Sequence, residues 1–183
     1  MKLKILANNA LNFSVNRVIE IIGITILIIG VLLLISLVTF SPDDPNFIFP
    51  NSTKINNILG FHGSFISDIF FQSIGIIALL IPFSLIISGI NIIINKKIFL
   101  IIENIFYIIL YSLVGSLFFS YFYPIAFKLY INGNGGFVGK YLGTTFLNSL
   151  ISINTQISYY ALILLVLILF LISIHFKIIS FYK

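Results

Sequence analysis

Residues 19–40 read IEIIGITILIIGVLLLISLVTF, and this stretch decides the fold class. An α-helix needs about 20 consecutive apolar residues to cross the hydrocarbon core of a bilayer. The stretch is long enough, and its one charged residue, Glu20, lies near its beginning. A cleaved signal peptide is disfavoured, because its apolar core is usually about 7–15 residues long and precedes a small-x-small cleavage site. The sequence after Leu37 contains no such site, so the stretch predicts a membrane-spanning helix.

Three further apolar runs follow, at residues 69–94, 99–122 and 157–176. The composition agrees with a membrane protein, since 60% of the residues are apolar, 8% are charged and the mean hydropathy is +1.17. A soluble domain carries about 25% charged residues. The sequence therefore predicts an all-α integral membrane protein with four transmembrane helices, and it excludes a soluble domain and a disordered chain.

Basic residues predict the orientation of these four helices. Seven of the ten lie before the first run, in the tight turn between the second and third runs, or after the fourth: Lys2, Lys4, Arg17, Lys96, Lys97, Lys177 and Lys183. The two longer connections carry the other three, Lys54, Lys128 and Lys140. Cytoplasmic segments are enriched in Lys and Arg. We expect both termini in the cytoplasm, with an N-terminal segment 1–18, a transmembrane domain 19–176 and a C-terminal stub 177–183. Anionic lipids explain the net charge of +5 better than nucleic acid does.

The residues that usually carry catalysis are scarce. The chain has no cysteine, two histidines and five acidic residues. This excludes disulfides, thiolate metal sites and cysteine nucleophiles. His62 has no partner at a suitable spacing. Glu103 lies one turn inside the third run, close enough to the interface that a proton or ion role is disfavoured. Asp43 and Asp44 could bind a divalent cation weakly, but a polar stop after the membrane is the favoured interpretation. We expect no catalytic residue, metal or cofactor in this chain.

The second outward loop contains the string GNGGFVGK at residues 133–140. A phosphate-binding P-loop needs Gly, four residues and then Gly-Lys-Ser/Thr. Asn134 and Tyr141 occupy the first and last positions of that motif, so the P-loop is rejected. The residues that follow alternate as in an amphipathic helix, with these apolar members: Phe137, Val138, Tyr141, Leu142, Phe146 and Leu150. They predict a short amphipathic or re-entrant helix at the outer interface.

Small residues at helical spacing predict close helix packing. Gly23 and Gly30 share a face of the first run. Serines recur every four residues on the second and third runs, at Ser84 and Ser88 and at Ser112, Ser116 and Ser120. Small faces let helices approach closely in membranes. Packing within the chain is favoured over a subunit interface. Pro82 is expected to kink the second run.

The ends of the first two runs contain local motifs. Glu20 follows Arg17 by three residues, so the two are expected to pair. Residues 57–68 predict an entry helix that runs into the second span, with Phe61 and Phe65 on one face.

The order of the motifs resembles a known family. In chain order they are Arg17 before the first span, Ser41-Pro42-Asp43-Asp44-Pro45 after it, Asn57-x-x-Gly60-x-x-Gly63, the internal Pro82, and Gly135-Gly136-x-x-Gly139. Residues 17–176 resemble the N-terminal four-span membrane domain of the bacterial FtsK/SpoIIIE DNA translocases. The resemblance marks nine motif residues as structural or assembly candidates: Asp43, Asp44, Asn57, Gly60, Gly63, Pro82, Gly135, Gly136 and Gly139.

The resemblance implies a function in cell division. It implies an inner-membrane protein at the division septum that forms a homo-oligomer, contacts other division proteins and couples division to chromosome segregation. The family's motor, which uses ATP and Mg²⁺ and engages DNA, is not expected within these residues, because they contain no Walker sequence. The alternatives are a small inner-membrane transporter or channel subunit, and a membrane enzyme. A transporter predicts ionisable groups near the midplane, and an enzyme predicts clustered His, Asp or Glu.

Overall fold

The computed structural model describes residues 2–45, 54–124 and 131–175, with side chains from residue 11 onward. The expected stub 177–183 and the last residue of the expected fourth span, Phe176, lie outside this part. Every regular element within it is a helix. Four helical segments are long and apolar enough to cross a membrane: Leu11–Val38, Gly60–Asn95, Phe99–Phe122 and Thr155–Ser173. The predicted fold class, an all-α protein with four membrane-spanning helices, is confirmed.

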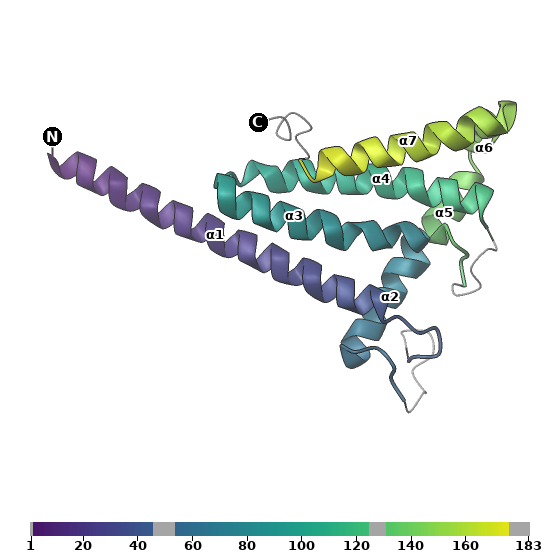
Figure 1. Cartoon of the computed structure of the whole chain (residues 1–183), viewed down its shortest axis with the longest axis horizontal. Helices are drawn as coiled ribbons and strands as arrows, with labels where there is room; N and C mark the ends of the chain where they lie inside the picture. Colours follow the sequence, from purple (N-terminus) through teal and green to yellow (C-terminus); the bar gives the residue numbers. More distant parts are fainter. Residues whose placement is uncertain (1, 46–53, 125–130, 176–183) are drawn as a thin grey trace, which may run out of the picture.

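Four long helices form a bundle, and shorter ones cover one end of it (Figure 1). In chain order the elements are α1 (Lys2–Val38), α2 (Gly60–Ile74), the 3₁₀ helix η1 (Gly75–Leu79), α3 (Leu80–Asn95), α4 (Phe99–Phe122), α5 (Gly136–Gly143), α6 (Phe146–Ile153) and α7 (Thr155–Ser173). Within the bundle α1 packs mainly on α3, and α7 packs mainly on α4. We call the end that holds the α3–α4 turn the turn end. There α1 begins and α7 ends (Figure 1).

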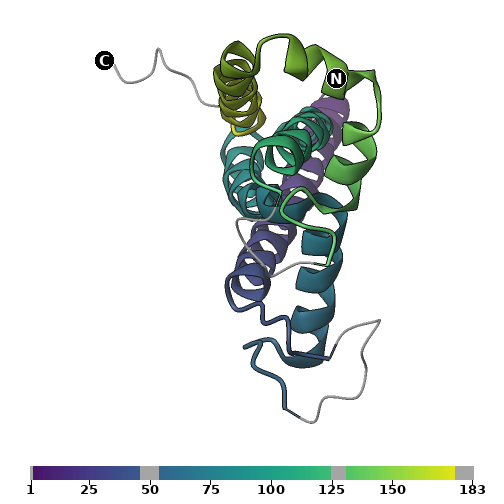
Figure 2. The ribbon, with the colours of Figure 1, turned by 90° about the vertical axis from the view of Figure 1, so that its right-hand side faces the viewer.

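The opposite end, which we call the loop end, is crossed by α2, α5 and α6 (Figures 1 and 2). The structure divides the predicted run 69–94 at Gly75, whose φ of +73° ends α2 and leads into η1 and α3. The expected kink at Pro82 is therefore misplaced, since the interruption begins at Gly75. Pro82 is buried in the first turn of α3, where a proline fits a helix well.

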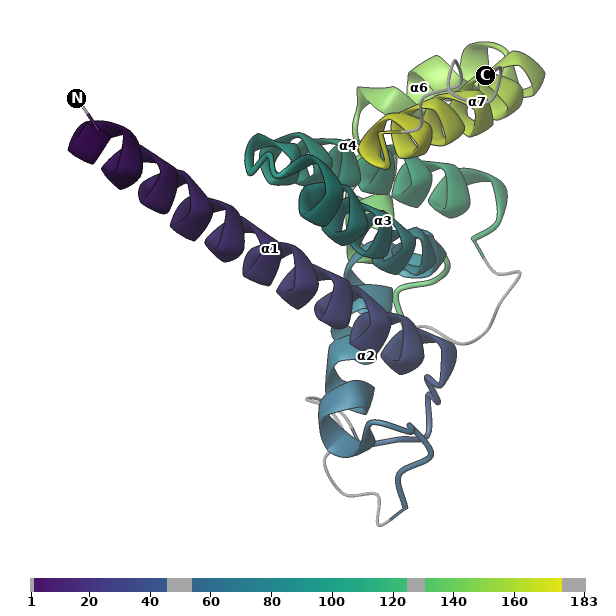
Figure 3. The same cartoon turned by 60° about the vertical axis from the view of Figure 1, so that its left-hand side comes forward.

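Close approach of α1 and α3 depends on glycine. A Cβ atom added at Gly23 would lie 3.0 Å from the carbonyl oxygen of Gly89, and one added at Gly30 would lie 3.0 Å from the backbone nitrogen of Ile86. The small face predicted on the first run thus packs within the chain, as expected. Beyond this contact α1 diverges from the bundle toward the turn end (Figure 3). The main apolar core lies where α1, α2, η1, α3 and α4 meet: Leu33, Leu37, Phe71, Ile77, Ala78, Ile81, Ile108 and Tyr111.

Candidate functional site

The adjacent carboxylates after the first span have different environments. Asp44 is only 2% exposed, whereas Asp43 is exposed. One carboxylate oxygen of Asp44 accepts a hydrogen bond from the backbone N–H of Asn56 at 2.7 Å, and the other accepts from the backbone N–H of Asn57 at 2.8 Å. Bonds of this charge-assisted kind are among the strong ones. Asp44 therefore organises the loop backbone, and both of its carboxylate oxygens are engaged in doing so.

Asn57 joins the end of α1 to the beginning of α2. Its amide nitrogen donates to the carbonyl oxygen of Ser36 at 2.9 Å, and its side-chain oxygen accepts from the backbone N–H of Leu59 at 3.1 Å. Ser36 in turn donates from its hydroxyl to the carbonyl oxygen of Gly63 at 2.7 Å. A Cβ atom at Gly63 would lie 2.1 Å from the side-chain oxygen of Asn57, so only glycine fits there. The spacing of the motif thus reflects one contact between α1 and α2.

Gly60 has a simpler role in the same motif. It begins α2 with a φ of +66°, and an added Cβ atom there would meet no atom within 4 Å. Its conformation favours glycine, but its surroundings leave room for a side chain.

The glycine loop, residues 133–139, leads into α5, includes the first turn of that helix and packs against α4. Added Cβ atoms at Gly135 and Gly139 would lie 2.4 Å and 2.3 Å from the carbonyl oxygen of Ser116. Gly136 has a φ of +64°, and its added Cβ atom would lie 2.6 Å from the backbone nitrogen of Gly75. The three glycines of the motif therefore allow backbone to approach backbone on two sides.

The end of α2 completes this contact through residues that the sequence analysis did not select. The backbone N–H of Ile76 donates to the carbonyl oxygen of Asn134 at 2.9 Å, and the hydroxyl of Ser116 donates to the carbonyl oxygen of Ile74 at 2.8 Å. Asn134 is fully buried, and its amide nitrogen donates to the carbonyl oxygen of Tyr123. A glycine inside an apolar run, here Gly75, was the signal available in the sequence.

α2 therefore links the two motifs of the loop end, the one around Asn57 and Gly63 and the glycine loop. Its first turn holds Gly63, which contacts Asn57, and its last residues contact the glycine loop. The nine selected residues thus fall into groups: those around Asp44 and Asn57 lie at the beginning of α2, and Gly135, Gly136 and Gly139 lie at its end. Pro82 lies apart from both, in α3.

Residues 136–153 form two short helices, α5 and α6, where one short helix was expected. Thr145 separates them and accepts a hydrogen bond from the backbone N–H of Leu147 at 3.4 Å, as an N-cap residue does. Large apolar side chains on these helices are exposed: Phe137, Tyr141, Phe146, Leu150 and Ile153. The segment thus exposes an apolar surface at the loop end. Its position at the membrane interface stays a prediction.

Two acidic side chains, Glu20 and Glu103, form ion pairs at the turn end among the described residues. Glu20 pairs with Arg17, as predicted, and also with Lys96 of the α3–α4 turn. Glu103 pairs with His175, at 2.9 Å between Oε2 and Nε2, and not with the lysines of the turn. His62 is exposed, and the described residues contain no group of three or more His, Cys, Asp or Glu side chains placed to hold a metal ion.

Comparison with protein families identifies this arrangement. Residues 15–183 match the family described as the 4TM region of DNA translocase FtsK/SpoIIIE. The chain belongs to this family. The match covers the four membrane-spanning segments and the motifs at residues 43–63 and 135–139. It confirms the resemblance drawn from the motif order. The FtsK/SpoIIIE membrane region is the anchor of a DNA translocase, so the chain is a multi-pass membrane protein of the inner membrane.

A curated relative supports the same family. Over 64 residues the chain is 41% identical to the DNA translocase FtsK of Rickettsia bellii (strain RML369-C). The matched stretch covers 35% of this chain and 8% of the relative. No solved structure matches the chain.

Proposed function

We propose that this chain anchors and assembles a DNA translocase at the division septum, where it couples cell division to chromosome segregation. The observation that carries the proposal is the match of residues 15–183 to the membrane region of FtsK/SpoIIIE translocases. That match lies in the membrane region and not in a motor, so the proposed role of these residues is non-enzymatic. ATP and Mg²⁺ belong to the motor in this proposal, and the chain itself binds no cofactor.

The proposed topology places the turn end in the cytoplasm. Arg17, Lys96 and Lys97 lie at or near the turn end, whereas Lys54 and Lys140 belong to the loop end. The positive-inside bias supports this orientation. It brings the beginning of α1 and the end of α7 to the cytoplasmic side, where a motor that follows α7 could act on DNA.

The proposed partners are the lipid bilayer, further copies of the chain and other proteins of the septum. DNA is contacted only through the motor. The polar side chains of Ser84, Tyr111 and Ser173 in the bundle interior disfavour the transporter alternative, because they bond one another. The hydroxyl of Ser84, for example, lies 3.1 Å from that of Tyr111 and 2.9 Å from that of Ser173. Such a cluster is an internal contact and leaves few groups for a transported ion.

A domain exchange in dividing bacteria tests the proposal. The chain, fused to a fluorescent protein and a host translocase motor, replaces the host's own membrane region. We expect a fluorescent band at the septum and normal chromosome segregation. Topology reporters placed after Lys140 and after Lys183 first establish that the fusion is inserted with the loop end outward. An evenly distributed, correctly inserted fusion that leaves chromosomes trapped at septa would overturn the proposed function.

Two glycine variants link that test to the glycine loop. Gly139→Val places side-chain atoms where the carbonyl oxygen of Ser116 lies 2.3 Å from Cβ, so we expect loss of the septal band and of the oligomer. Gly143→Val is the matched control, because the nearest atom to its Cβ is 3.8 Å away. If both variants assemble and localise like the parent, the glycine loop has no role in assembly.

A further inference from the structure

The last membrane helix, α7, has little lateral support. It packs mainly on α4 and makes few contacts with α3. All 19 of its residues are described, and of these only Ser173, the last, is buried. Van der Waals packing is a main source of helix association in membranes, because the lipid is as apolar as the side chains. α7 is thus held mainly along one side, by α4.

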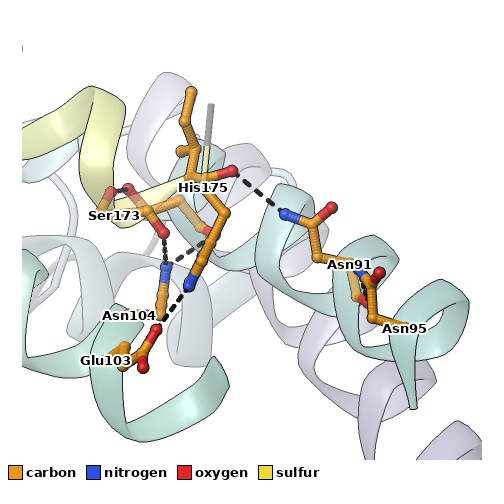
Figure 4. Close-up of polar contacts among 8 residues, drawn as sticks. Asn91, Asn95, Glu103, Asn104, Ser173 and His175 are labelled. Carbon is orange, nitrogen blue, oxygen red and sulfur yellow. Dashed lines mark hydrogen bonds and ion pairs between the residues drawn. The ribbon is translucent and has the colours of Figure 1, made fainter. Parts of the chain in front are cut away.

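A cluster of polar side chains holds its final turn (Figure 4). We call this cluster the α7 clasp, and its members are Ser84, Asn91, Glu103, Asn104, Ser173 and His175. The amide nitrogen of Asn104 donates to the carbonyl oxygen of Ser173 at 2.8 Å, and that of Asn91 donates to the carbonyl oxygen of Ile174 at 3.1 Å. The last carbonyls of a helix lack partners within the helix. Here α4 and α3 each supply one.

The side chains of the final turn are bonded as well. The hydroxyl of Ser173 lies 2.9 Å from that of Ser84, and Nε2 of His175 lies 2.9 Å from the carboxylate of Glu103. His175 has a φ of +52°, so the helix ends in a left-handed residue directly at the clasp. Asn104, Ser84 and Ser173 are all nearly or fully buried. The exit of the chain from the membrane is therefore fastened to both helices of the α3–α4 hairpin.

We propose that the α7 clasp is a force-transmitting joint, which passes a pull on the chain beyond His175 to the α3–α4 hairpin. The origin of the pull rests on the proposed function, since a motor that follows α7 would generate it. The joint itself follows from geometry. A pull on the C-terminus of a helix unwinds its last turn first, and the buried groups there, on Ser84, Asn104 and Ser173, lose their partners before water reaches them. The clasp bonds are attached to that same turn.

Single-molecule force measurement on the whole chain in bicelles tests the joint. Handles fused to the two termini load α7, and the rate at which its last turn detaches is measured at constant force. Asn104→Leu removes the bonds to Ser173 and to the carbonyl oxygen of Ser84 with little change of size. We expect detachment to become about threefold faster, because one weak membrane hydrogen bond to α7, the one to Ser173, is lost.

Asn95→Leu is the matched control. Asn95 lies one turn beyond Asn91, is exposed, and bonds only the carbonyl oxygen of Asn91 on its own helix (Figure 4). We expect an unchanged detachment rate. If Asn104→Leu yields no folded protein, Asn91→Leu replaces it. That residue is half-buried and contributes one bond to Ile174, so its loss should accelerate detachment about threefold.

A second pulling geometry distinguishes a force-transmitting joint from a general stabilisation of the bundle. With handles at the N-terminus and after Thr144, between α5 and α6, the force bypasses α7, and Asn104→Leu should leave the rate of opening unchanged. Equal acceleration in both geometries, or no acceleration when α7 is loaded, would overturn the joint. The measurement needs no motor and no septum, so its result is independent of the localisation test of the proposed function.

Discussion

The two ends of the bundle are fastened by different means. At the loop end, side-chain bonds such as those of Asp44 are joined by contacts of backbone with backbone, as where Gly136 meets Gly75 and where Gly139 meets the carbonyl oxygen of Ser116. At the turn end, separate side chains such as Asn104 and Asn91 reach across to backbone carbonyls. Backbone contacts leave no space for a substituent, whereas side-chain bonds can be removed one at a time. A single substitution at a backbone contact of the loop end should therefore cause a large loss of stability. A single substitution at the turn end should cause a small one.

The largest effect is expected at Gly75. In Gly75→Ala the Cβ atom would lie 1.9 Å from the carbonyl oxygen of Asn134, and the φ of +73° adds strain. We expect a loss of about 3 kcal/mol or more, since overpacking and a left-handed alanine each cost about 1–3 kcal/mol. The measurement is the melting temperature of a fluorescent fusion, followed by size-exclusion chromatography after heating.

Gly60→Ala is its control, because it shares the positive φ but has open space around the added Cβ atom. It should lose only about 1 kcal/mol. Equal losses in the two variants would show that strain alone, and not the contact with Asn134, fixes the need for glycine at Gly75.

The next effect is expected at Asp44. In Asp44→Asn one of the two carboxylate oxygens becomes an amide NH₂ group, which cannot accept a hydrogen bond. One of the two backbone N–H donors, those of Asn56 and Asn57, then lacks its acceptor in a buried site. The cost should be about 2–3 kcal/mol. Membrane insertion should be unaffected, because the change lies outside the spans. Asp43→Asn, at the exposed neighbour, should stay within about 0.5 kcal/mol of the parent. A matching loss at Asp43 would contradict the division of roles between the two carboxylates.

A smaller effect is expected at the turn end. Ser84→Ala removes the hydroxyl that bonds both Tyr111 and Ser173, and we expect a loss of about 1 kcal/mol. The same heating assay measures it. A loss as large as that of Gly75→Ala would remove the proposed difference between the two ends.

The four spans and the family were readable from the sequence because both depend on local patterns. The run at residues 19–40 is apolar independently of its tertiary contacts, and the glycine motif is recognised by its spacing. The sequence could not show what each glycine meets. Gly75 and Asn134 contact each other across a long separation in the chain, and the clasp joins Asn104 to a residue 69 positions away. Contacts of this kind depend on the packed bundle, and no periodicity encodes them.

The break of the second run illustrates the same limit. Proline was the expected cause, since it is the strongest helix breaker. Gly75 instead breaks the helix, with a φ of +73° that favours glycine and with the backbone of Asn134 directly beside it. The tertiary contact thus decides between two breakers that the sequence offers within one run.

The smallest effect is expected for the ion pairs of the turn end. Glu20→Gln removes partners of Arg17 and Lys96, and exposed ion pairs contribute little because water and salt screen them. The variant should melt slightly below the parent at low salt, and the difference should vanish at about 1 M salt, where the screening length falls to about 3 Å. Ser84→Ala, which breaks uncharged bonds in the interior, should show the same loss at both salt concentrations. A salt-independent loss for Glu20→Gln would mean that this carboxylate is shielded as well as the clasp is, and that the turn end is more rigidly fastened than its exposed charges indicate.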